Sequence, residues 1–395
     1  MAATPPLSPH RFEAVEAHIR DLVDRQALPH GQFLAARDGE VLHAFHAGPA
    51  REDGRALRPD ALYRIASMTK AVTAVAFLML VEQGRVGLKD SVASVLPELS
   101  DLQVYSGEKI TGFPTRSAAR QPVMLDLLTH VAGFTYSFQN VSPIDQLYWT
   151  RGIDNFKAPI TREAMLAALA GLPLLHDPGA RFTYSIATDL IGLIVERLAD
   201  RPLDDFLAER IFAPLGMTDT GFALRPGQRE RHTDAWAIHP RLGRYLYDPA
   251  EGGLWTDPKR FPSGGGGLLS TVADYHRFCR MLLGRGALDG ERLLRPETVE
   301  DMTRNHLPGG GSIGAMSISK FSGEAYYDSG HGLGIGVSLP GAMQPWPAGG
   351  FNWGGLFSTW YRVTPASGLI LIFMTQIIPL EESSLIADVH GILFG

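Results

Sequence analysis

The segment 71–81 contains no charged residue. If it is helical, it must be buried on every side. The sequence Ser67-Met-Thr-Lys70 directly precedes this segment. We expect one helix over 67–83, ended at Gln83-Gly84 because glycine can adopt the left-handed conformation past the last turn.

Ser67 and Lys70 are three residues apart, so a helix places them on one face. Burial at the start of the helix would favour the neutral form of the lysine. A neutral amine could accept the proton of the serine and activate its hydroxyl for attack on a carbonyl carbon. The alternative is a helix-capping serine beside a solvated lysine.

The four-residue spacing occurs twice more, as Ser106/Lys109 and Ser317/Lys320. The first pair lies among glycine and proline residues, which favours a turn. The second lies in a Gly/Ser-rich stretch without an apolar run behind it. Only Ser67 opens a helix that could hold the pair rigidly.

Composition narrows the class of protein. The chain has 395 residues, of which 45% are hydrophobic, and a net charge of −6. It can therefore bury a large core, and the absence of a dense basic run argues against a nucleic-acid partner. The single cysteine, Cys279, excludes an intramolecular disulfide, and we expect a half-buried reduced thiol on a helix.

The sequence also predicts the cellular location of the protein and its partners. No charged region followed by an apolar core is present at residues 1–6, and no apolar run is long enough to span a bilayer. We expect a cytoplasmic protein with no membrane partner, and we leave room for a homo-oligomer. His43 and His46 would point to opposite faces of a strand, and no Cys/His cluster is present, so we expect no metal site.

Hydrophobic patterning predicts strands at both ends of the chain and helices in the middle. We expect an antiparallel α/β (α+β) sheet assembled from both termini, with helices around it and an inserted, mostly helical part. The expected elements are helices at 9–26, 190–198, 272–283 and 380–392, a hairpin 33–37/41–45 turned at Asp38-Gly39, and strands at 331–338, 356–363 and 369–375.

Two further segments bear on chemistry. Tyr184 lies where a loop meets an apolar helix, and its phenol could serve as a general base or acid beside an ammonium group. Its alternative is a half-buried core tyrosine. Trp353-Gly354-Gly355-Leu356 lets the backbone approach a ligand closely, so an N–H could face a developing oxyanion. Its alternative is a strand-entry turn with a packed tryptophan.

Taken together in chain order, these segments resemble the serine β-lactamase and penicillin-binding-protein superfamily. The closest likeness is to its esterase branch, the family VIII carboxylesterases, which are similar to class C β-lactamases. The resemblance spans most of the chain and includes several motifs: Arg64-Ile-Ala-Ser67-Met-Thr-Lys70, Leu127-Leu-Thr-His130-Val-Ala-Gly133, Tyr184-Ser-Ile186, Pro214-Leu-Gly-Met217, Gly264-Gly-Gly-Gly-Leu268 with Ser270-Thr-Val-Ala-Asp274, and Trp353-Gly-Gly355.

This resemblance implies a role for each matching position. Ser67 would be the acylated nucleophile, with Lys70 and Tyr184 sharing its proton. The backbone N–H groups of Ser67 and Leu356 would form the oxyanion hole, and no metal or organic cofactor would be needed. The sheet domain would comprise 1–90 and 236–395 and the helical subdomain 91–235, with the active site in the cleft between them.

Departures from the β-lactamase pattern predict the substrate. Ile186 stands where those enzymes have asparagine, and Trp353-Gly354-Gly355 replaces Lys-Thr-Gly, whose lysine helps bind a carboxylate. The site should therefore favour small neutral esters, and we expect a serine carboxylesterase acting on short acyl chains. The alternatives are an acyltransferase using the same acyl-enzyme, as in similar fungal polyketide acyltransferases, a weak β-lactamase, and a catalytically inactive ligand-binding module.

Four further aromatic residues could line an acyl or alcohol pocket, although ordinary packing is the favoured interpretation of each one taken singly: Tyr136, Trp149, His331 and Trp360. Ser312 lies in Gly310-Gly-Ser-Ile-Gly314, which matches the lipase motif G-x-S-x-G. That motif requires a strand before it and a helix after it. Neither flank is evident here, so we do not expect Ser312 to be catalytic.

Overall fold

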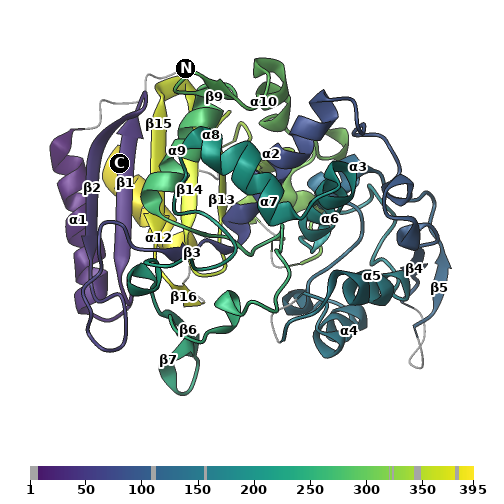
Figure 1. Ribbon diagram of the computed structural model, residues 1–395, viewed down its shortest axis with the longest axis horizontal. Coiled ribbons are helices and arrows are strands. Elements are labelled where there is room, and N and C mark those ends of the chain that lie inside the picture. Colours follow the sequence, from purple (N-terminus) through teal and green to yellow (C-terminus); the bar gives the residue numbers. More distant parts are fainter. Residues whose placement is uncertain are drawn as a thin grey trace.

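The computed structural model describes residues 8–107, 113–154, 158–319, 321–322, 324–341, 348–378 and 382–395. Within these residues, the main sheet has seven antiparallel strands in the order β11-β12-β13-β14-β15-β1-β2 (Figure 1). Its strands come from both ends of the chain, as the sequence predicts: β1 Gly31–Arg37, β2 Glu40–Ala47, β11 Ser329–His331, β12 Gly336–Ser338, β13 Phe351–Gly354, β14 Trp360–Thr364 and β15 Leu369–Met374.

The first hairpin forms as expected from its turn. Asp38 and Gly39 both have positive φ, 50° and 89°, the conformation that a two-residue hairpin turn requires. β1 then pairs with β15 on its other edge, with Phe33 opposite Phe373. The two ends of the chain are therefore joined through a central pair of strands.

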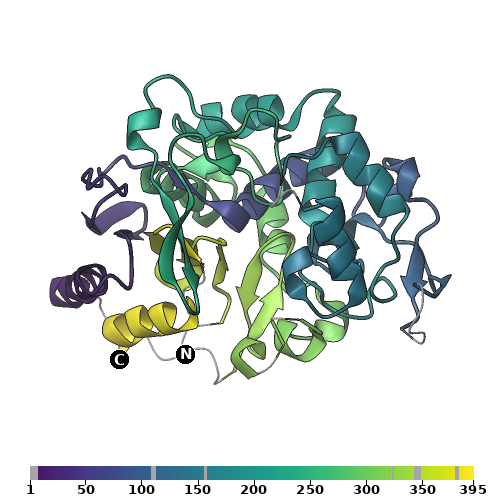
Figure 2. The same ribbon diagram turned by 90° about the horizontal axis from the view of Figure 1, so that it is seen from below.

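Helices α1 (Pro9–Asp24) and α12 (Glu382–Phe394) cover one face of the sheet and lie side by side (Figure 2). Their apolar residues form one cluster with side chains of β1 and β15. Arg11 adds a hydrogen bond of 2.5 Å to the carbonyl oxygen of Leu393. This layer is made entirely from the two termini.

The opposite face carries α2 (Thr69–Glu82) and α9 (Val272–Leu283). Every residue of α2 from 69 to 80 is buried, because the helix lies between the sheet and α6 (Ala187–Ala199). This confirms the burial expected from its lack of charge. Gly84 has a φ of 69°, which confirms the expected stop. Cys279 on α9 is fully buried, not half-buried, and burial raises the pKa of its thiol well above the usual value.

The remaining helices lie mainly between residues 124 and 316: α3 Met124–Leu128, α4 Pro143–Arg151, α5 Arg162–Ala170, α7 Leu203–Leu207, α8 Ala213–Leu215, α10 Pro296–Met302 and α11 Ile313–Met316. The small sheets are β4 Gln103–Tyr105 with β5 Thr115–Ser117, β3 Tyr63–Arg64 with β8 Leu269–Ser270, β9 Ala287–Leu288 with β10 Glu291–Arg292, and β6 Ala235–His239 with β7 Gly243–Asp248 and β16 Ile377–Ile378. In the described part of the chain, no helix combines the length and apolarity needed to cross a bilayer.

Two expected strands are wrong in their bounds. The segment 331–338 is divided between β11 and β12, because the chain turns at Gly334, which has a φ of 79°. The backbone also passes close to α2 there, since a Cβ on Gly334 would lie 2.5 Å from the Cβ of Ala74. The strand expected at 356–363 begins only at Trp360, since Ser358 has a φ of 63°. The closing helix was expected from Leu380, which lies outside the described residues.

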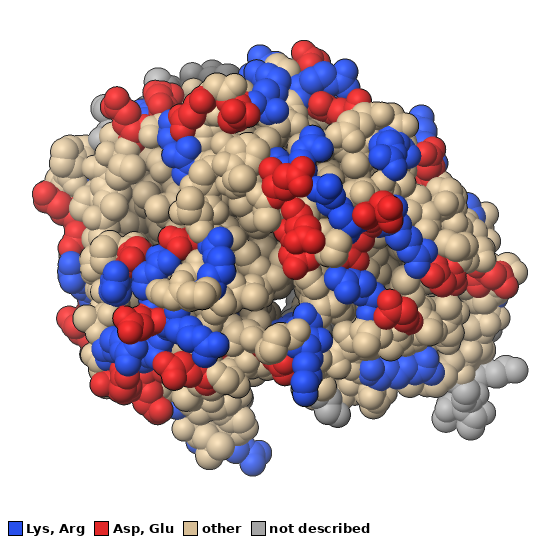
Figure 3. Space-filling view, in the orientation of Figure 1, with Lys and Arg blue, Asp and Glu red and all other residues tan. Residues whose placement is uncertain are grey.

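Positive and negative side chains are intermixed on the face in Figure 3. The same view shows a deep hollow near the middle of the molecule, between the side with the sheet and the side with helices α3 to α6. The fold is therefore an antiparallel sheet between terminal and central helices, with a helical part attached, which confirms the expected fold class.

Candidate active site

Ser67 lies in a short 3₁₀ turn, Ala66–Met68, that leads directly into α2. Ala66 has a φ of 43°, a conformation that is unfavourable for a residue with a Cβ and must be held by its surroundings. Leu268 holds the turn from both sides: its carbonyl oxygen accepts from the N–H of Ile65 at 3.1 Å, and its N–H donates to Thr69 Oγ1 at 3.2 Å. The backbone at Ser67 is thus fixed before any substrate binds.

Lys70 is only 1% exposed, whereas Ser67 is partly exposed. The Nζ of Lys70 donates to Gly265 O at 2.6 Å, to Tyr136 Oη at 3.1 Å and to Ser67 Oγ at 3.3 Å. A lysine ammonium has three N–H groups, so these three acceptors use all of them. The serine and lysine expected to act together are in hydrogen-bond contact.

Tyr184 lies just before α6 and is 5% exposed. Its ring centroid is 4.6 Å from Lys70 Nζ, which places the cation over the ring face. Its hydroxyl oxygen accepts a hydrogen bond of 3.3 Å from the indole N–H of Trp353. The structure therefore brings Tyr184 to the site, while the phenol that bonds Lys70 belongs to Tyr136.

Aromatic rings form a wall beside these groups. Trp353 lies 5.5 Å from the Tyr184 ring and 6.1 Å from that of Phe321, with which it stacks. Phe138 stacks on Tyr136 at 4.9 Å. No sequence pattern points to Phe138 or Phe321, because an isolated phenylalanine carries no signal that separates a site from a core.

A pair of buried histidines lies behind Tyr184. His130 is 4.8 Å from the Tyr184 ring and 5.3 Å from His331. Burial lowers the pKa of His331 to about 4, and burial together with the neighbouring His331 and Lys70 holds that of His130 well below its usual value. Both side chains are therefore neutral near pH 7. The ring of His331 packs against that of Trp353, with 5.2 Å between the ring centroids, and His331 is only 1% exposed.

The backbone expected to form the oxyanion hole follows β13. Gly355 is pressed against the serine turn, since a Cβ there would lie 2.5 Å from Ile65 O. Leu356 packs in a cluster that contains Ala66, the neighbour of Ser67. The end of β13 and the serine turn are thus adjacent, while the role of Ser67 N–H and Leu356 N–H stays a prediction.

Three residues expected to bind substrate lie elsewhere or deeper. Ile186 is fully buried in the main core at the start of α6. Trp360 belongs to the cluster under α1 and α12, on the opposite face of the sheet from α2, so the structure separates it from Ser67. Trp149 lies on α4 and is 45% exposed.

The competing motifs have other surroundings. Ser312 caps the short helix α11 by accepting from Ala315 N at 3.3 Å, and a 3₁₀ turn, Pro308–Gly310, precedes it instead of a strand. The arrangement does not fit a lipase nucleophile. Lys109 and Lys320 lie outside the described residues.

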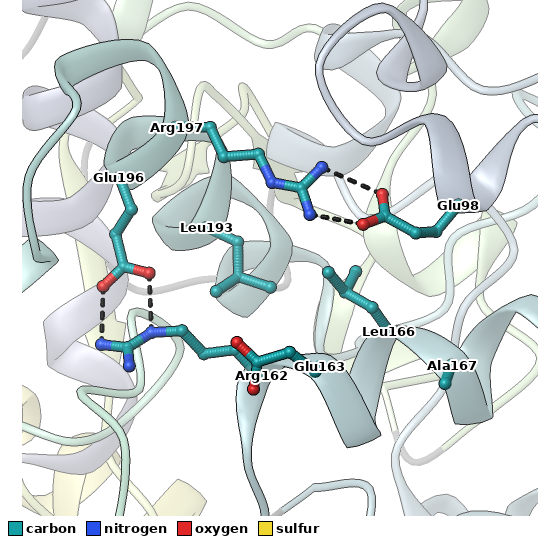
Figure 4. A pocket seen from close by; sticks show the side chains of 8 residues that line it. All are labelled: Glu98, Arg162, Glu163, Leu166, Ala167, Leu193, Glu196 and Arg197. Atoms are coloured by element: carbon teal, nitrogen blue, oxygen red, sulfur yellow. Dashed lines mark hydrogen bonds and ion pairs between the residues drawn. The ribbon is translucent and has the colours of Figure 1, made fainter.

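A cavity of about 390 Å³ lies apart from these residues, between α5 and α6 (Figure 4). Its arginines are paired with glutamates, Arg162 with Glu196 at 2.7 Å and Arg197 with Glu98 at 2.5 Å. In the described ranges, no group of three His, Cys, Asp or Glu side chains could hold a metal ion.

Chemically, the site offers a reachable hydroxyl, an amine in contact with it, and two phenols around the amine. Such a set can accept the serine proton and return it to a leaving group. An antiparallel sheet between helical layers with this cluster at the head of α2 defines a serine hydrolase of the β-lactamase and penicillin-binding-protein type.

The model of the Beta-lactamase family matches residues 15–388, and the chain belongs to this family. Protein Rv1367c of Mycobacterium tuberculosis is 35% identical over 92% of this chain and 90% of that protein. Acyltransferase mokF of Monascus pilosus is 33% identical over 75% of this chain and 71% of that protein, and Esterase EstB of Burkholderia gladioli is 29% identical over 87% and 84%.

A solved structure supports the fold. EstCE1, described as a hydrolase with promiscuous acyltransferase activity, superposes with a TM-score of 0.78 at 22% identity and covers 98% of both chains. The protein is an enzyme of the serine hydrolase class, in a family that includes esterases and acyltransferases.

Proposed function

We propose that this protein is a serine carboxylesterase that hydrolyses small neutral esters with short acyl chains. The observation that carries the proposal is the 3.3 Å contact between Lys70 Nζ and Ser67 Oγ, with the amine buried and the hydroxyl reachable. Because the family assignment makes the protein an enzyme, an inactive ligand-binding module is no longer proposed.

In the proposed reaction, Ser67 Oγ attacks the ester carbonyl carbon while its proton passes to Lys70, with Tyr184 sharing it. The backbone N–H groups of Ser67 and Leu356 stabilise the negative charge on the carbonyl oxygen. The bond from carbon to the alcohol oxygen then breaks, and the alcohol leaves with the proton. Water attacks the acyl-enzyme in the same way, which releases the acid and restores Ser67.

The substrate class follows from the side chains near the serine. Trp353 on β13 stands where the Lys-Thr-Gly motif of β-lactamases carries a cation, and its neighbours are the rings of Tyr184 and Phe321. An apolar wall favours neutral groups over anions, which would lose hydration without gaining a partner. The name of EstB, an esterase, supports the same choice.

An acyltransferase is the second candidate, because mokF is named as one. It would use the same acyl-enzyme with an alcohol in place of water. We retain weak β-lactamase activity as a further alternative.

We also propose that the active site lies between a sheet domain (1–90 and 236–395) and a helical subdomain (91–235). We propose further that the protein is cytoplasmic and that it can form a homo-oligomer.

The test is hydrolysis of p-nitrophenyl acetate, butyrate and octanoate by the wild type and Ser67→Ala, with a chromogenic cephalosporin measured in parallel. We expect turnover that prefers short chains and falls to background in Ser67→Ala. Ser312→Ala is the matched control and should retain full activity. A serine-directed phosphonate should label Ser67, as read by peptide mass spectrometry.

Three results would change the assignment. Full activity in Ser67→Ala would show that another residue is the nucleophile. Cleavage of the cephalosporin alone would overturn the neutral-ester substrate. Ester products with an added alcohol, exceeding hydrolysis in water, would favour the acyltransferase.

A further inference from the structure

Asp189 is a nearly buried carboxylate beside the proposed active site that the mechanism above does not use. It is the third residue of α6 and is 7% exposed. Its Oδ1 accepts from Ser263 Oγ at 2.5 Å and from Gly265 N at 3.1 Å. Its carboxylate is also hydrogen-bonded to the hydroxyl of Tyr136.

Two of these three partners contact Lys70 directly. Gly265 binds Asp189 through its N–H and Lys70 through its carbonyl oxygen, at 2.6 Å. Tyr136 binds Asp189 through its hydroxyl, and the same oxygen lies 3.1 Å from Lys70 Nζ. Asp189 is therefore joined to Lys70 by two separate bridges.

The direction of the hydrogen bonds follows from the chemistry of the groups. A phenol has one proton, and a carboxylate can only accept, so Tyr136 donates its proton to Asp189. The phenol oxygen then faces Lys70 with lone pairs and must accept from it. Burial, followed by the nearby charge of Asp189, raises the pKa of Tyr136 well above its usual value, so the phenol keeps this proton.

This arrangement fixes the orientation of the amine. A neutral lysine has two N–H groups and one lone pair. In the charged form the third N–H donates to Ser67 Oγ at 3.3 Å. In the neutral form that a base requires, Gly265 O and Tyr136 Oη still accept the two remaining N–H groups, so the lone pair faces Ser67 Oγ. That is the geometry a general base needs to remove the serine proton.

The backbone at Gly265 allows the peptide to approach the carboxylate of Asp189. A Cβ on Gly265 would overlap Asp189 Oδ2, so residue 265 must be a glycine for the peptide to reach the carboxylate. A helix-capping acid would need only the N–H groups of its own helix. Here the carboxylate instead holds a distant loop and a phenol.

We propose that Asp189 is a positioning residue that acts through Tyr136 and Gly265 to aim the lone pair of Lys70 at Ser67. The inference rests on the proposed function, because it assigns Lys70 the role of base. The other titratable and charged groups that act on Lys70, Tyr136 or Asp189 are Tyr184, His130, His331, Asp154 and Arg260.

The test compares Asp189→Asn, Tyr136→Phe and the double variant, using kcat and KM for p-nitrophenyl acetate between pH 5 and 9. An asparagine amide donates to Tyr136 Oη, which turns the phenol proton toward Lys70 and blocks its lone pair. We expect Asp189→Asn to lower kcat by about 10²-fold with little change in KM.

Tyr136→Phe removes one bridge, so it should also lower kcat, and the double variant should be no worse than Asp189→Asn. If the losses of kcat in the two single variants do not add in the double variant, the two residues act through the same contacts with Lys70. Thr188→Val is the control for packing beside Asp189: Thr188 is 1% exposed and its hydroxyl has no hydrogen-bond partner among the described residues, so this variant should match the wild type.

The second measurement is the labelling of Ser67 by a serine-directed phosphonate. The extent of labelling gives the number of folded, active molecules, and the rate of labelling reports the reactivity of Ser67. Slower labelling in Asp189→Asn is the expected result. If the melting temperature falls while kcat per labelled site is unchanged, Asp189 is only structural and the inference is wrong. If the wild type itself shows no Ser67-dependent turnover or labelling, the proposed function fails as well.

Discussion

Trp353 donates its indole N–H to the hydroxyl oxygen of Tyr184 over 3.3 Å, joining residues 169 positions apart in the chain. The bond connects β13, an inner strand of the main sheet, with the loop before α6. Because the phenol oxygen accepts from Trp353, its proton stays available to Ser67 or to a leaving alcohol. In this protein the tryptophan thus orients the proposed acid–base group and lines an apolar wall.

Replacing Trp353 with phenylalanine should keep the ring and remove the donor. A hydrogen bond of this kind is worth about 1 kcal/mol, so we expect kcat to fall by about 5-fold. Trp360→Phe is the matched control, because that indole packs on the other face of the sheet and its N–H has no partner among the described residues. Equal losses in both variants would argue against a role for the Trp353 donor.

Gly355→Ala should damage the proposed oxyanion hole. The new Cβ would lie 2.5 Å from Ile65 O, so the turn that carries the Leu356 N–H must move. Loss of one oxyanion donor typically lowers kcat by about 10²–10³-fold. Gly221→Ala, where no atom lies within 4 Å of the added Cβ, should leave kcat unchanged. Normal turnover by Gly355→Ala would place the oxyanion hole elsewhere.

The buried ion pair between Arg64 and Asp248 predicts a large effect on stability. Its atoms are 2.6 Å apart and the side chains are 0% and 4% exposed. Asp248→Ala would leave the guanidinium buried without its carboxylate, which costs about 3–5 kcal/mol of unfolding free energy. Asp21→Ala removes an exposed partner of Arg25 and should change little. Urea unfolding curves measure both, and similar midpoints would contradict the prediction.

Stability should fall as the pH is lowered from about 6.5 towards 4. Burial lowers the pKa of His331 from 6.5 to about 4 in the folded chain. Between these values the unfolded chain binds more protons, so the free energy of unfolding decreases with falling pH. The full contribution, present above pH 6.5, is at most about 3 kcal/mol.

His331→Phe keeps an aromatic ring among Phe182 and Trp353 but cannot be protonated. Its unfolding free energy should therefore depend less steeply on pH over this range. His30 and His276, whose pKa values burial also lowers to about 4, would account for part of the remaining slope. An unchanged slope in His331→Phe would show that His331 is not a source of the pH dependence.

Local sequence patterns predicted some helices and strands correctly and misplaced the bounds of others. The apolar run of α2 and the Asp38-Gly39 turn each have a local physical cause, so their helix and hairpin formed where expected. The strand bounds near Gly334 and Ser358 were missed, because those positive φ angles depend on packing against α2 and on the turn after β13.

The sequence by itself determined that Ser67 and Lys70 would lie close together at the start of a buried helix, because they are three residues apart and an uncharged run follows them. Only the tertiary structure decided which groups surround the amine. Tyr136, Asp189 and Gly265 come from three separate segments. Their meeting depends on how α6 and the glycine-rich loop pack against α2, and long-range packing of that kind leaves no periodic or local signal in the chain.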